Sequence, residues 1–208
     1  MIRLIVFDLG GVIFRLDKQL AIARFKEIGV DNIERYLDDY EQKGFFGELE
    51  SGKITAEEFR RRLSQEAGRE LTMDECERGW TGYAAERYQR NFDALLRLKA
   101  EGYALALLSN TNPFMMRWVR SNEFDGHGHS LDYYIPHQYL SYEMGLMKPD
   151  PLIFTRMLDA EHARAGETLF LDDSARNCAA AASVGIHTYQ PENGGDWTTV
   201  IHSLLSQF

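Results

Sequence analysis

Short apolar runs alternate with amphipathic stretches along most of this chain. Three clear runs cover residues 2–7, 105–108 and 168–171, and two weaker ones cover 186–189 and 133–135. Apolar residues at consecutive positions are typical of strands that a parallel sheet buries on both faces. The stretches between the runs have helical patterns: residues 86–99, 113–120, 151–161 and 175–184. This alternation predicts an α/β fold with a doubly wound, Rossmann-like parallel sheet.

Residues 17–82 differ from the rest because they have helical periodicity and no convincing strand. The stretch contains two capping-box patterns, which begin at Thr55 and Thr72 and mark helix starts. We therefore expect an α/β core formed by residues 1–16 and 83–208. The stretch between them is predicted to be a helical cap inserted after the first strand.

Four polar segments follow predicted strands or lie in a loop beside a helix start. They are Phe7–Val12, Leu108–Asn112, Met147–Pro149 and Leu171–Ser174. In an open parallel sheet, ligands bind in the crevice beyond the carboxyl ends of the strands. We expect the sheet to bring these segments together there, beneath the helical insertion. The sequence therefore predicts one site built from all four segments.

Three of these segments carry groups that could handle a phosphate ester. Asp8 precedes two glycines, so a substrate can approach its carboxylate closely. Such an aspartate can act as a nucleophile and form an acyl phosphate, although alone it also suits a turn or a helix cap. Ser109 and Asn110 offer a hydroxyl and backbone N–H groups to an anion near a helix start. Lys148 could neutralise a transferring phosphoryl group, although an isolated lysine is more often simply solvated.

The fourth segment carries adjacent carboxylates, Asp172 and Asp173, after an apolar run. Two carboxylates at a sheet edge are unfavourable without a cation, and Mg²⁺ typically takes few protein carboxylates while keeping several waters. Adjacent side chains diverge, so one could bind the ion directly while the other acts through a water molecule or orients the lysine. Asn177 could steady this loop or simply lie on a helix surface. The pair therefore predicts a Mg²⁺ site.

With all four segments in order, the chain resembles the haloacid dehalogenase-like hydrolases over its full length. Its Asp-Leu-Gly-x-Val, Leu-Ser-Asn-Thr-Asn, Lys-Pro and Phe-x-Asp-Asp segments are similar to those of the bacterial α-D-glucose-1-phosphate phosphatase branch. The resemblance implies that Asp8 is the nucleophile and that Lys148 stabilises charge. It also implies that Ser109, the Asn110 backbone and Lys148 bind the phosphoryl oxygens.

The resemblance further implies that Asp8, the Gly10 carbonyl and Asp173 bind Mg²⁺, with Asp172 in a supporting role. Gly10 is also where the chain departs from the wider family, which has an aspartate there to protonate the leaving oxygen. A positioned acid or base typically contributes ~10²–10⁴-fold to the rate. Asp17 is a speculative substitute, although it also suits a linker or a helix N-cap.

Three alternatives to phosphate hydrolysis differ in the residues that they require at this site. A phosphomutase must move protons on and off sugar hydroxyls, so Gly10 argues against it. A 2-haloacid dehalogenase needs neither a leaving-group proton nor a metal, but dehalogenases lack a pair such as Asp172 and Asp173. A catalytically weakened domain would show an eroded site, and only Gly10 hints at that. We expect a Mg²⁺-dependent phosphomonoester hydrolase that forms an aspartyl phosphate and acts on a small metabolite such as glucose 1-phosphate. A dehalogenase-type hydrolase and a weakened domain remain the alternatives.

A few other residues are weaker candidates for function. Four near the ends of the insertion could reach the leaving group, although aromatic side chains there more often pack: Phe14, Arg15, Trp80 and Tyr83. His127 and His129 lie two residues apart, but no third metal ligand is near them in the sequence. His137 is expected to be a surface or packing residue.

Charge and composition limit the partners. The chain has 208 residues, 44% of them hydrophobic, and a formal net charge of −9, so it can bury a full core but offers no positive field to nucleic acids or anionic membranes. No apolar stretch approaches the ~18 residues that span a bilayer. The two cysteines, Cys76 and Cys178, are expected to be buried thiols rather than a disulfide. We expect a cytoplasmic protein, a monomer or weak homo-oligomer, that binds a small phosphorylated metabolite.

Overall fold

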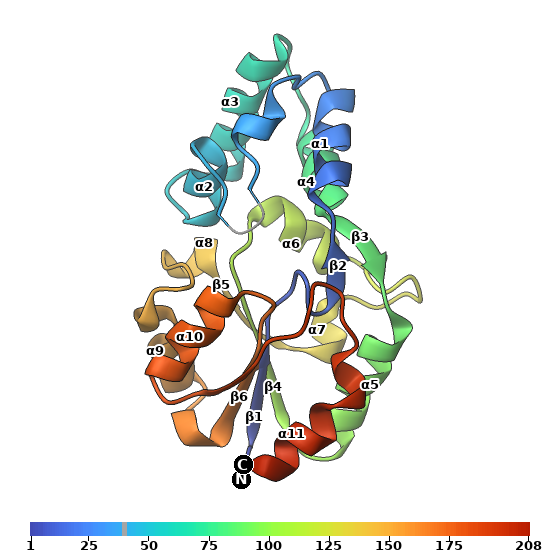
Figure 1. The fold of residues 1–208 in the computed structure, drawn as a ribbon. Coiled ribbons are helices and arrows are strands. Elements are labelled where there is room, and N and C mark those ends of the chain that lie inside the picture. Colours follow the sequence, from blue (N-terminus) through green and yellow to red (C-terminus); the bar gives the residue numbers. More distant parts are fainter. Residues whose placement is uncertain (39–40) are drawn as a thin grey trace.

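The computed structural model describes residues 1–38 and 41–208 and shows an α/β core beneath a layer of helices (Figure 1). The core sheet has five parallel strands in the order β5-β4-β1-β6-β7. Their bounds are β1 Leu4–Phe7, β4 Ala104–Ser109, β5 His137–Leu140, β6 Thr168–Leu171 and β7 His187–Tyr189. The predicted parallel sheet is confirmed.

Helices cover both faces of this sheet. Alternate residues of β1 face opposite sides: Leu4 and Val6 belong to one buried cluster, and Ile5 and Phe7 belong to the other. The first cluster includes residues of α9 and α10, and the second includes residues of α5, α6 and α11. The core helices are α5 Gln89–Ala100, α6 Pro113–Val119, α7 Leu131–Tyr134, α8 Ser141–Met144, α9 Pro151–Ala160, α10 Ala175–Ser183 and α11 Ile201–Gln207. Short 3₁₀ turns cover Ala165–Glu167 and Trp197–Thr199.

The helical insert that follows β1 lies above the carboxyl ends of the strands in Figure 1. Its elements are α1 Lys18–Glu27, α2 Phe45–Glu50, α3 Ala56–Ala67 and α4 Met73–Trp80, with 3₁₀ turns at Ile33–Arg35 and Thr81–Tyr83. Thr72 forms the predicted capping box of α4, and the Thr55 side chain caps α3 by accepting from the Glu58 N–H. The insert is confirmed, while the limits at 17 and 82 stay a prediction.

Aromatic side chains form the centre of this insert. The Phe46 ring lies within 5.4 Å of those of Phe25, Phe59 and Trp80, centroid to centroid. All four side chains are almost completely buried. Contacts between aromatic rings at such distances stabilise beyond the area that they bury. The insert therefore has an apolar core of its own.

One predicted strand is wrong, and other strands were not predicted. Tyr133 and Tyr134 lie in α7 rather than in a strand, and the edge strand β5 begins at His137. Sequence patterns also missed an antiparallel pair, β2 Phe14–Leu16 with β3 Ala84–Arg87, at the two ends of the insert. Because β3 takes residues up to Arg87, the helix predicted from residue 86 begins only at Gln89.

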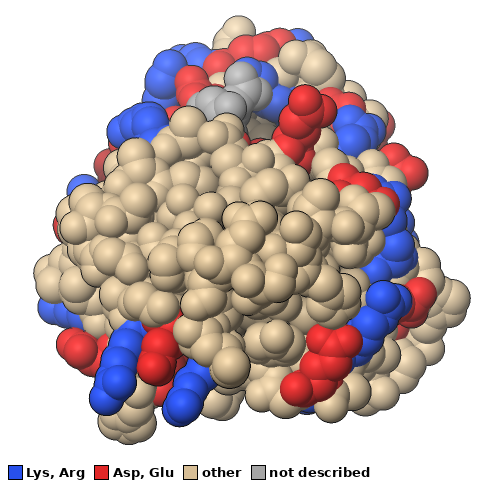
Figure 2. Space-filling model, turned by 60° about the horizontal axis from the view of Figure 1, so that its bottom comes forward, with Lys and Arg blue, Asp and Glu red and all other residues tan. Residues whose placement is uncertain are grey.

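No helix in the described ranges is long and apolar enough to cross a membrane. Figure 2 views the molecule more from below than Figure 1 does, and the centre of that face has neither acidic nor basic residues. Its basic side chains lie at the margin beside acidic ones rather than in one basic patch. The expected absence of a nucleic-acid partner stays a prediction.

Candidate active site

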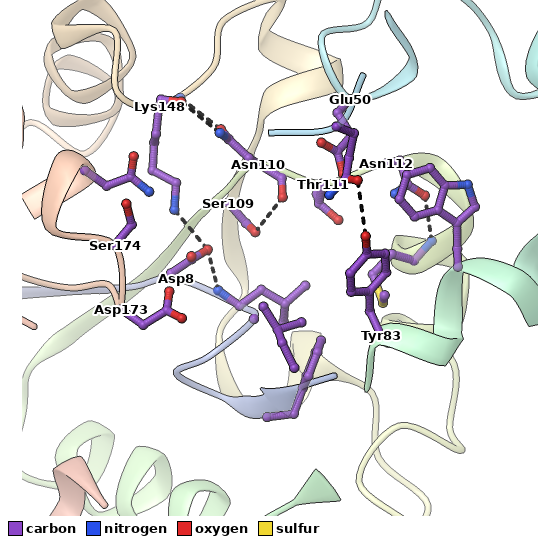
Figure 3. Close-up of a pocket in the computed structure, with 18 residues that line it drawn as sticks. Asp8, Glu50, Tyr83, Ser109, Asn110, Thr111, Asn112, Lys148, Asp173 and Ser174 are labelled. Atoms are coloured by element: carbon purple, nitrogen blue, oxygen red, sulfur yellow. Dashed lines mark hydrogen bonds and ion pairs between the residues drawn. The ribbon is translucent and has the colours of Figure 1, made fainter. Parts of the chain in front are cut away.

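The four polar segments meet in one cavity of about 100 Å³ at the carboxyl edge of the sheet (Figure 3). Its core side is lined by predicted site residues: Asp8, Gly10, Ser109, Asn110, Lys148 and Asp173. Asp8 follows β1, Ser109 ends β4 and Asp173 follows β6, so three neighbouring strands deliver these side chains. The sheet therefore brings together site residues that lie far apart in the sequence.

Lys148 is the central cation of this site, and its side chain is only 1% exposed. Its Nζ lies 2.9 Å from Asp8 Oδ1 and 2.6 Å from Asp172 Oδ2, and it donates to the Leu108 carbonyl over 2.9 Å. Burial alone would lower the pKa of Lys148, but the negative charges of Asp172 and Asp8 outweigh burial and raise it. The lysine therefore stays protonated and faces the candidate nucleophile.

Asp172 is completely buried and holds Lys148 in place. Its carboxylate also accepts hydrogen bonds from the Ser174 N–H and from Nδ2 of Asn177. Asn177 thus steadies this loop rather than simply lying on a helix surface, which was the other interpretation of the sequence. With both oxygens occupied, Asp172 is a positioning group for the lysine rather than an open ligand.

Asp173 points toward Asp8 in the cavity instead (Figure 3). Burial and the negative charge of the neighbouring Asp172, opposed by Lys148, together raise its pKa to about 6. The backbone leaves room for this carboxylate only because residue 11 is glycine: Gly11 has φ +77°, and a Cβ there would lie 2.3 Å from Asp173 Oδ2. The close approach of this turn to Asp173 therefore requires glycine.

Asp8 is in an environment that favours its protonated form. Burial and the charges of Asp172 and Asp173 raise its pKa, Lys148 lowers it, and the net result is a pKa of about 7. Carboxylate oxygens of Asp8, Asp172 and Asp173 all lie within 4.8 Å of one another. Three carboxylates at this separation repel one another strongly, and one lysine does not balance them.

The end of β4 is joined to the lysine segment by the Asn110 side chain. Asn110 Oδ1 accepts from the Lys148 N–H, and its Nδ2 donates to the Lys148 carbonyl, each over 2.8 Å. This leaves the Asn110 backbone and the Ser109 hydroxyl as the groups that could receive an anion. Their role in binding phosphate stays a prediction.

The helical insert forms the opposite wall of the cavity. It contributes Gln42, Glu50, Trp80 and Tyr83, while Phe14 and Leu16 come from β2. The Tyr83 hydroxyl donates to Gln42 Oε1 over 3.1 Å. Sequence reasoning named Phe14, Trp80 and Tyr83 but missed Glu50. Its position was the available signal, because it follows Phe45, Phe46 and Leu49 on the buried side of α2.

Other sequence candidates have structural roles. The Asp17 side chain caps α1 by accepting from the N–H groups of Gln19 and Leu20, and Asp17 does not line the cavity. Arg15 does not line it either and lies 3.7 Å from Asp17. His129 bonds Asp125 and lies outside the one metal-ligand cluster found among the described residues.

His137 and the two cysteines also have the structural roles that the sequence predicts. His137 bonds the Glu161 carboxylate on the surface. Cys76 and Cys178 are both buried, free thiols, as expected.

The chain matches the haloacid dehalogenase-like hydrolase family over residues 2–185. It belongs to this family. It is 44% identical over 206 residues to the D-ribitol-5-phosphate phosphatase of Bacteroides thetaiotaomicron, which covers 99% of this chain and 100% of that relative.

Solved structures of relatives have the same fold. A predicted HAD-like family hydrolase from Porphyromonas gingivalis superimposes with a TM-score of 0.91 at 43% identity, covering 99% of this chain and 98% of that one. A HAD family enzyme from Bacteroides thetaiotaomicron, in complex with magnesium and inorganic phosphate, superimposes with a TM-score of 0.87 at 36% identity, covering 96% and 99% of the two chains. A 2-haloacid dehalogenase from Pseudomonas syringae shares 18% identity at a TM-score of 0.66, which shows the fold alone.

These relatives confirm the wider resemblance and correct the narrower one. Family membership agrees with the motifs of the four segments. The similarity to a glucose-1-phosphate phosphatase branch is not supported, because the curated relative that covers the whole chain is named for D-ribitol 5-phosphate.

Proposed function

We propose that this protein is a Mg²⁺-dependent phosphomonoesterase that hydrolyses the phosphate ester of a small polyol, of the class of D-ribitol 5-phosphate. One observation carries the proposal: a buried lysine contacts the Asp8 carboxylate in a cavity that other carboxyl groups also line. A nucleophilic carboxylate beside a fixed cation suits transfer of a phosphoryl group through a covalent intermediate.

The residues present fit a divalent cation. The oxygens of Asp8 and Asp173 are close together, and the pKa of each carboxyl is raised, to about 7 and about 6. Hard oxygen donors of this kind are the ligands that Mg²⁺ prefers. We assign Asp8, the Gly10 carbonyl and Asp173 as its ligands, with Asp172 holding the lysine. Solved structures of one relative, the HAD family enzyme from Bacteroides thetaiotaomicron, contain magnesium and support this assignment.

The reaction divides between residues of the core. Asp8 attacks the phosphorus and becomes the aspartyl phosphate, while the substrate alcohol leaves. Lys148 neutralises charge on Asp8 and on the phosphoryl oxygens, and the Ser109 hydroxyl and Asn110 backbone donate to those oxygens. Bound Mg²⁺ would add positive charge beside the same oxygens. Water then attacks the phosphorus, releasing inorganic phosphate and restoring Asp8.

The substrate class is supported by the relative and by the cavity. The relative named for D-ribitol 5-phosphate matches the chain end to end. The wall opposite Asp8 offers Gln42 and Tyr83, which are polar groups suited to a hydroxylated alcohol. The cavity is small, so the insert would enclose a metabolite rather than a polymer. A cytoplasmic location and a monomeric or weakly associated state belong to the same proposal.

The central test replaces the nucleophile. Asp8→Asn should abolish Mg²⁺-dependent release of phosphate from p-nitrophenyl phosphate and from D-ribitol 5-phosphate, because an amide cannot form the intermediate. Asp17→Asn is the matched control, since asparagine also caps helices well, and it should retain wild-type rates. Activity that survives in Asp8→Asn, or that survives removal of divalent cations with a chelator, would refute the mechanism.

A panel of phosphate esters tests the substrate class separately. We expect kcat/KM to be highest for pentitol phosphates, lower for aldose phosphates and lowest for nucleotides. The measurement is release of inorganic phosphate at equal enzyme concentration. A preference for glucose 1-phosphate over D-ribitol 5-phosphate would overturn the substrate assignment while leaving the phosphatase mechanism intact.

A further inference from the structure

The active site has no acid at position 10, and the space for one is filled. A Cβ on Gly10 would lie 2.8 Å from both Cδ atoms of Leu16, which comes from β2. A polyol phosphate nevertheless loses an alkoxide, which is a strong base and needs a proton as the P–O bond breaks. Another group in the cavity must supply that proton.

Five titratable side chains among the described residues line the cavity: Asp8, Glu50, Tyr83, Lys148 and Asp173. The proposed function uses Asp8 as the nucleophile and Asp173 as a metal ligand. Lys148 is held by two carboxylates and a carbonyl. The Tyr83 hydroxyl is directed to Gln42 Oε1. Glu50 is the remaining acid.

Glu50 ends α2 on the insert side of the cavity, across from Asp8 (Figure 3). The residue is 7% exposed, and the Ser141 hydroxyl of the core donates to its backbone carbonyl over 2.6 Å. This bond connects the end of α2 to the core beside Thr111, whose N–H donates to the same serine oxygen. The backbone that carries the Glu50 side chain is therefore fixed relative to the end of β4 that we propose binds phosphate.

The surroundings of Glu50 keep its proton on. Burial and, to a smaller extent, the charge of Asp8 raise the pKa of Glu50, a hydrogen bond with Asn112 lowers it, and the net result is a pKa of about 8. No cation is among these influences, so the protonated, neutral carboxyl group is more stable in this buried position than the carboxylate. The acid is therefore largely protonated at neutral pH.

Asn112 also determines which oxygen carries the proton. Its Oδ1 accepts from the N–H groups of Phe114 and Met115 and so caps α6. Only its NH₂ group is left for Glu50, and this group must donate to one carboxyl oxygen. The second oxygen of Glu50 is left to carry the O–H.

We propose that Glu50 is the catalytic acid that protonates the departing alkoxide, in place of the acid that position 10 lacks. This role rests on the proposed phosphatase activity. In the first step an Asp8 oxygen bonds to phosphorus, the bond from phosphorus to the ester oxygen breaks, and that oxygen takes its electron pair and the Glu50 proton. In the second step water attacks phosphorus, the Asp8–phosphorus bond breaks, and the water proton returns to Glu50. The products are the free alcohol and inorganic phosphate.

Glu50→Gln tests the proposal, because glutamine keeps the size and polarity of the side chain but has no proton to give. The measured quantity is kcat/KM, which reports only steps up to release of the alcohol. Three substrates differ in what they need: D-ribitol 5-phosphate, ethyl phosphate, which has no free hydroxyl, and p-nitrophenyl phosphate, whose leaving group departs as a stable anion. We expect roughly 10²–10⁴-fold losses with both alkyl esters and a change below about tenfold with the aryl ester.

Each other pattern overturns the proposal. A loss with D-ribitol 5-phosphate alone would make Glu50 a ligand for a substrate hydroxyl, and equal losses with all three esters would make its role structural. Glu48→Gln is the matched control on the same helix, because Glu48 is paired with Arg62 and does not line the cavity. It should leave all three values unchanged.

A second test uses the wild-type protein alone and measures kcat/KM for a series of phosphate esters whose leaving alcohols differ in acidity. Proton donation predicts a shallow dependence of kcat/KM on the acidity of the leaving alcohol, and a steep dependence would overturn the proposal even if Glu50→Gln failed to fold. Absence of Mg²⁺-dependent hydrolysis of the aryl ester by the wild-type protein would instead refute the proposed function itself.

Discussion

Single residues with unusual backbone or burial determine how this site is built. Gly11 combines a positive φ with a close approach to Asp173, whereas Asp8, the other carboxylate that we assign to Mg²⁺, is placed by the strand before it. A glycine at such a position has two separable functions, because it relieves backbone strain and leaves space for a carboxylate. Substitution can therefore distinguish them.

Gly11→Ala should inactivate the enzyme, because the new Cβ would overlap the Asp173 carboxylate that we assign to Mg²⁺. Gly68→Ala is the matched control: its φ is +66°, nothing lies within 4 Å of its Cβ position, and it ends α3 far along the insert. Both changes should lower the free energy of unfolding by about 1 kcal/mol or more through backbone strain. Mg²⁺ titration calorimetry and phosphatase assays should show a defect only in Gly11→Ala. Equal Mg²⁺ binding by the two variants would contradict this reading of Gly11.

The convergence of the core residues in one cavity could be predicted from the sequence, whereas Glu50 on the opposite wall could not. Asp8, Lys148 and Asp173 follow strands or lie in short motifs, so their convergence could be inferred from sheet topology alone. Glu50 could not be placed this way, since α2 reaches the cavity only through packing of the insert against the core. A charged residue at the end of an apolar helix face was the only local sign of its burial.

At the scale of elements, errors arose where a strand is short or polar. β5 reads His-Gln-Tyr-Leu and pairs only with β4, so an edge position removes the continuous apolar run that marked the other strands. β2 has three residues and β3 carries exposed charges, so the β2–β3 pair had no strand signature either. The central strands and long helices were correct because burial on two sides constrains their composition.

Helix α5 fixes the turn that carries Gly10 and Gly11. The buried Asn91 side chain donates to the carbonyls of Val12 and Ile13, each over 3.0 Å. Asn91→Ala should lower the free energy of unfolding by about 2 kcal/mol, because two buried carbonyls lose a donor. Urea unfolding measures the change, and Gln89→Ala on the exposed side of the same helix should shift it by less than about 0.5 kcal/mol. Similar shifts for both variants would contradict this account of the turn.

Across the whole molecule, carboxyl groups with opposite pKa shifts occupy different regions. On the surface of the insert, hydrogen bonds from arginines lower the pKa of Glu58 and Glu75 to about 2. In the cavity, burial raises the pKa of Asp8 and Glu50 to about 7 and about 8. The free energy of unfolding rises with pH between the folded and unfolded pKa values of the surface carboxyls. It falls with pH between the unfolded and folded pKa values of the cavity carboxyls. Metal-free protein should therefore be most stable between about pH 4 and pH 5, where the gain from the surface carboxyls is nearly complete and the loss from the cavity carboxyls is only beginning.

Between pH 6 and pH 8 the cavity groups dominate. Folded Glu50 holds its proton up to about pH 8, while the unfolded side chain has already lost its own, so the free energy of unfolding falls as pH rises through this window. We expect urea unfolding of wild-type protein in a chelator to show lower stability at pH 8 than at pH 6. Glu50→Gln should lose less over the same interval, because glutamine does not titrate, and Glu48→Gln should behave as the wild type. Adding Mg²⁺ at pH 8 should restore stability, since the cation offsets the charges of Asp8 and Asp173. A wild-type stability that rises from pH 6 to pH 8 without metal would mean that Glu50 is ionised in the folded protein, and it would remove the acid from the proposed mechanism.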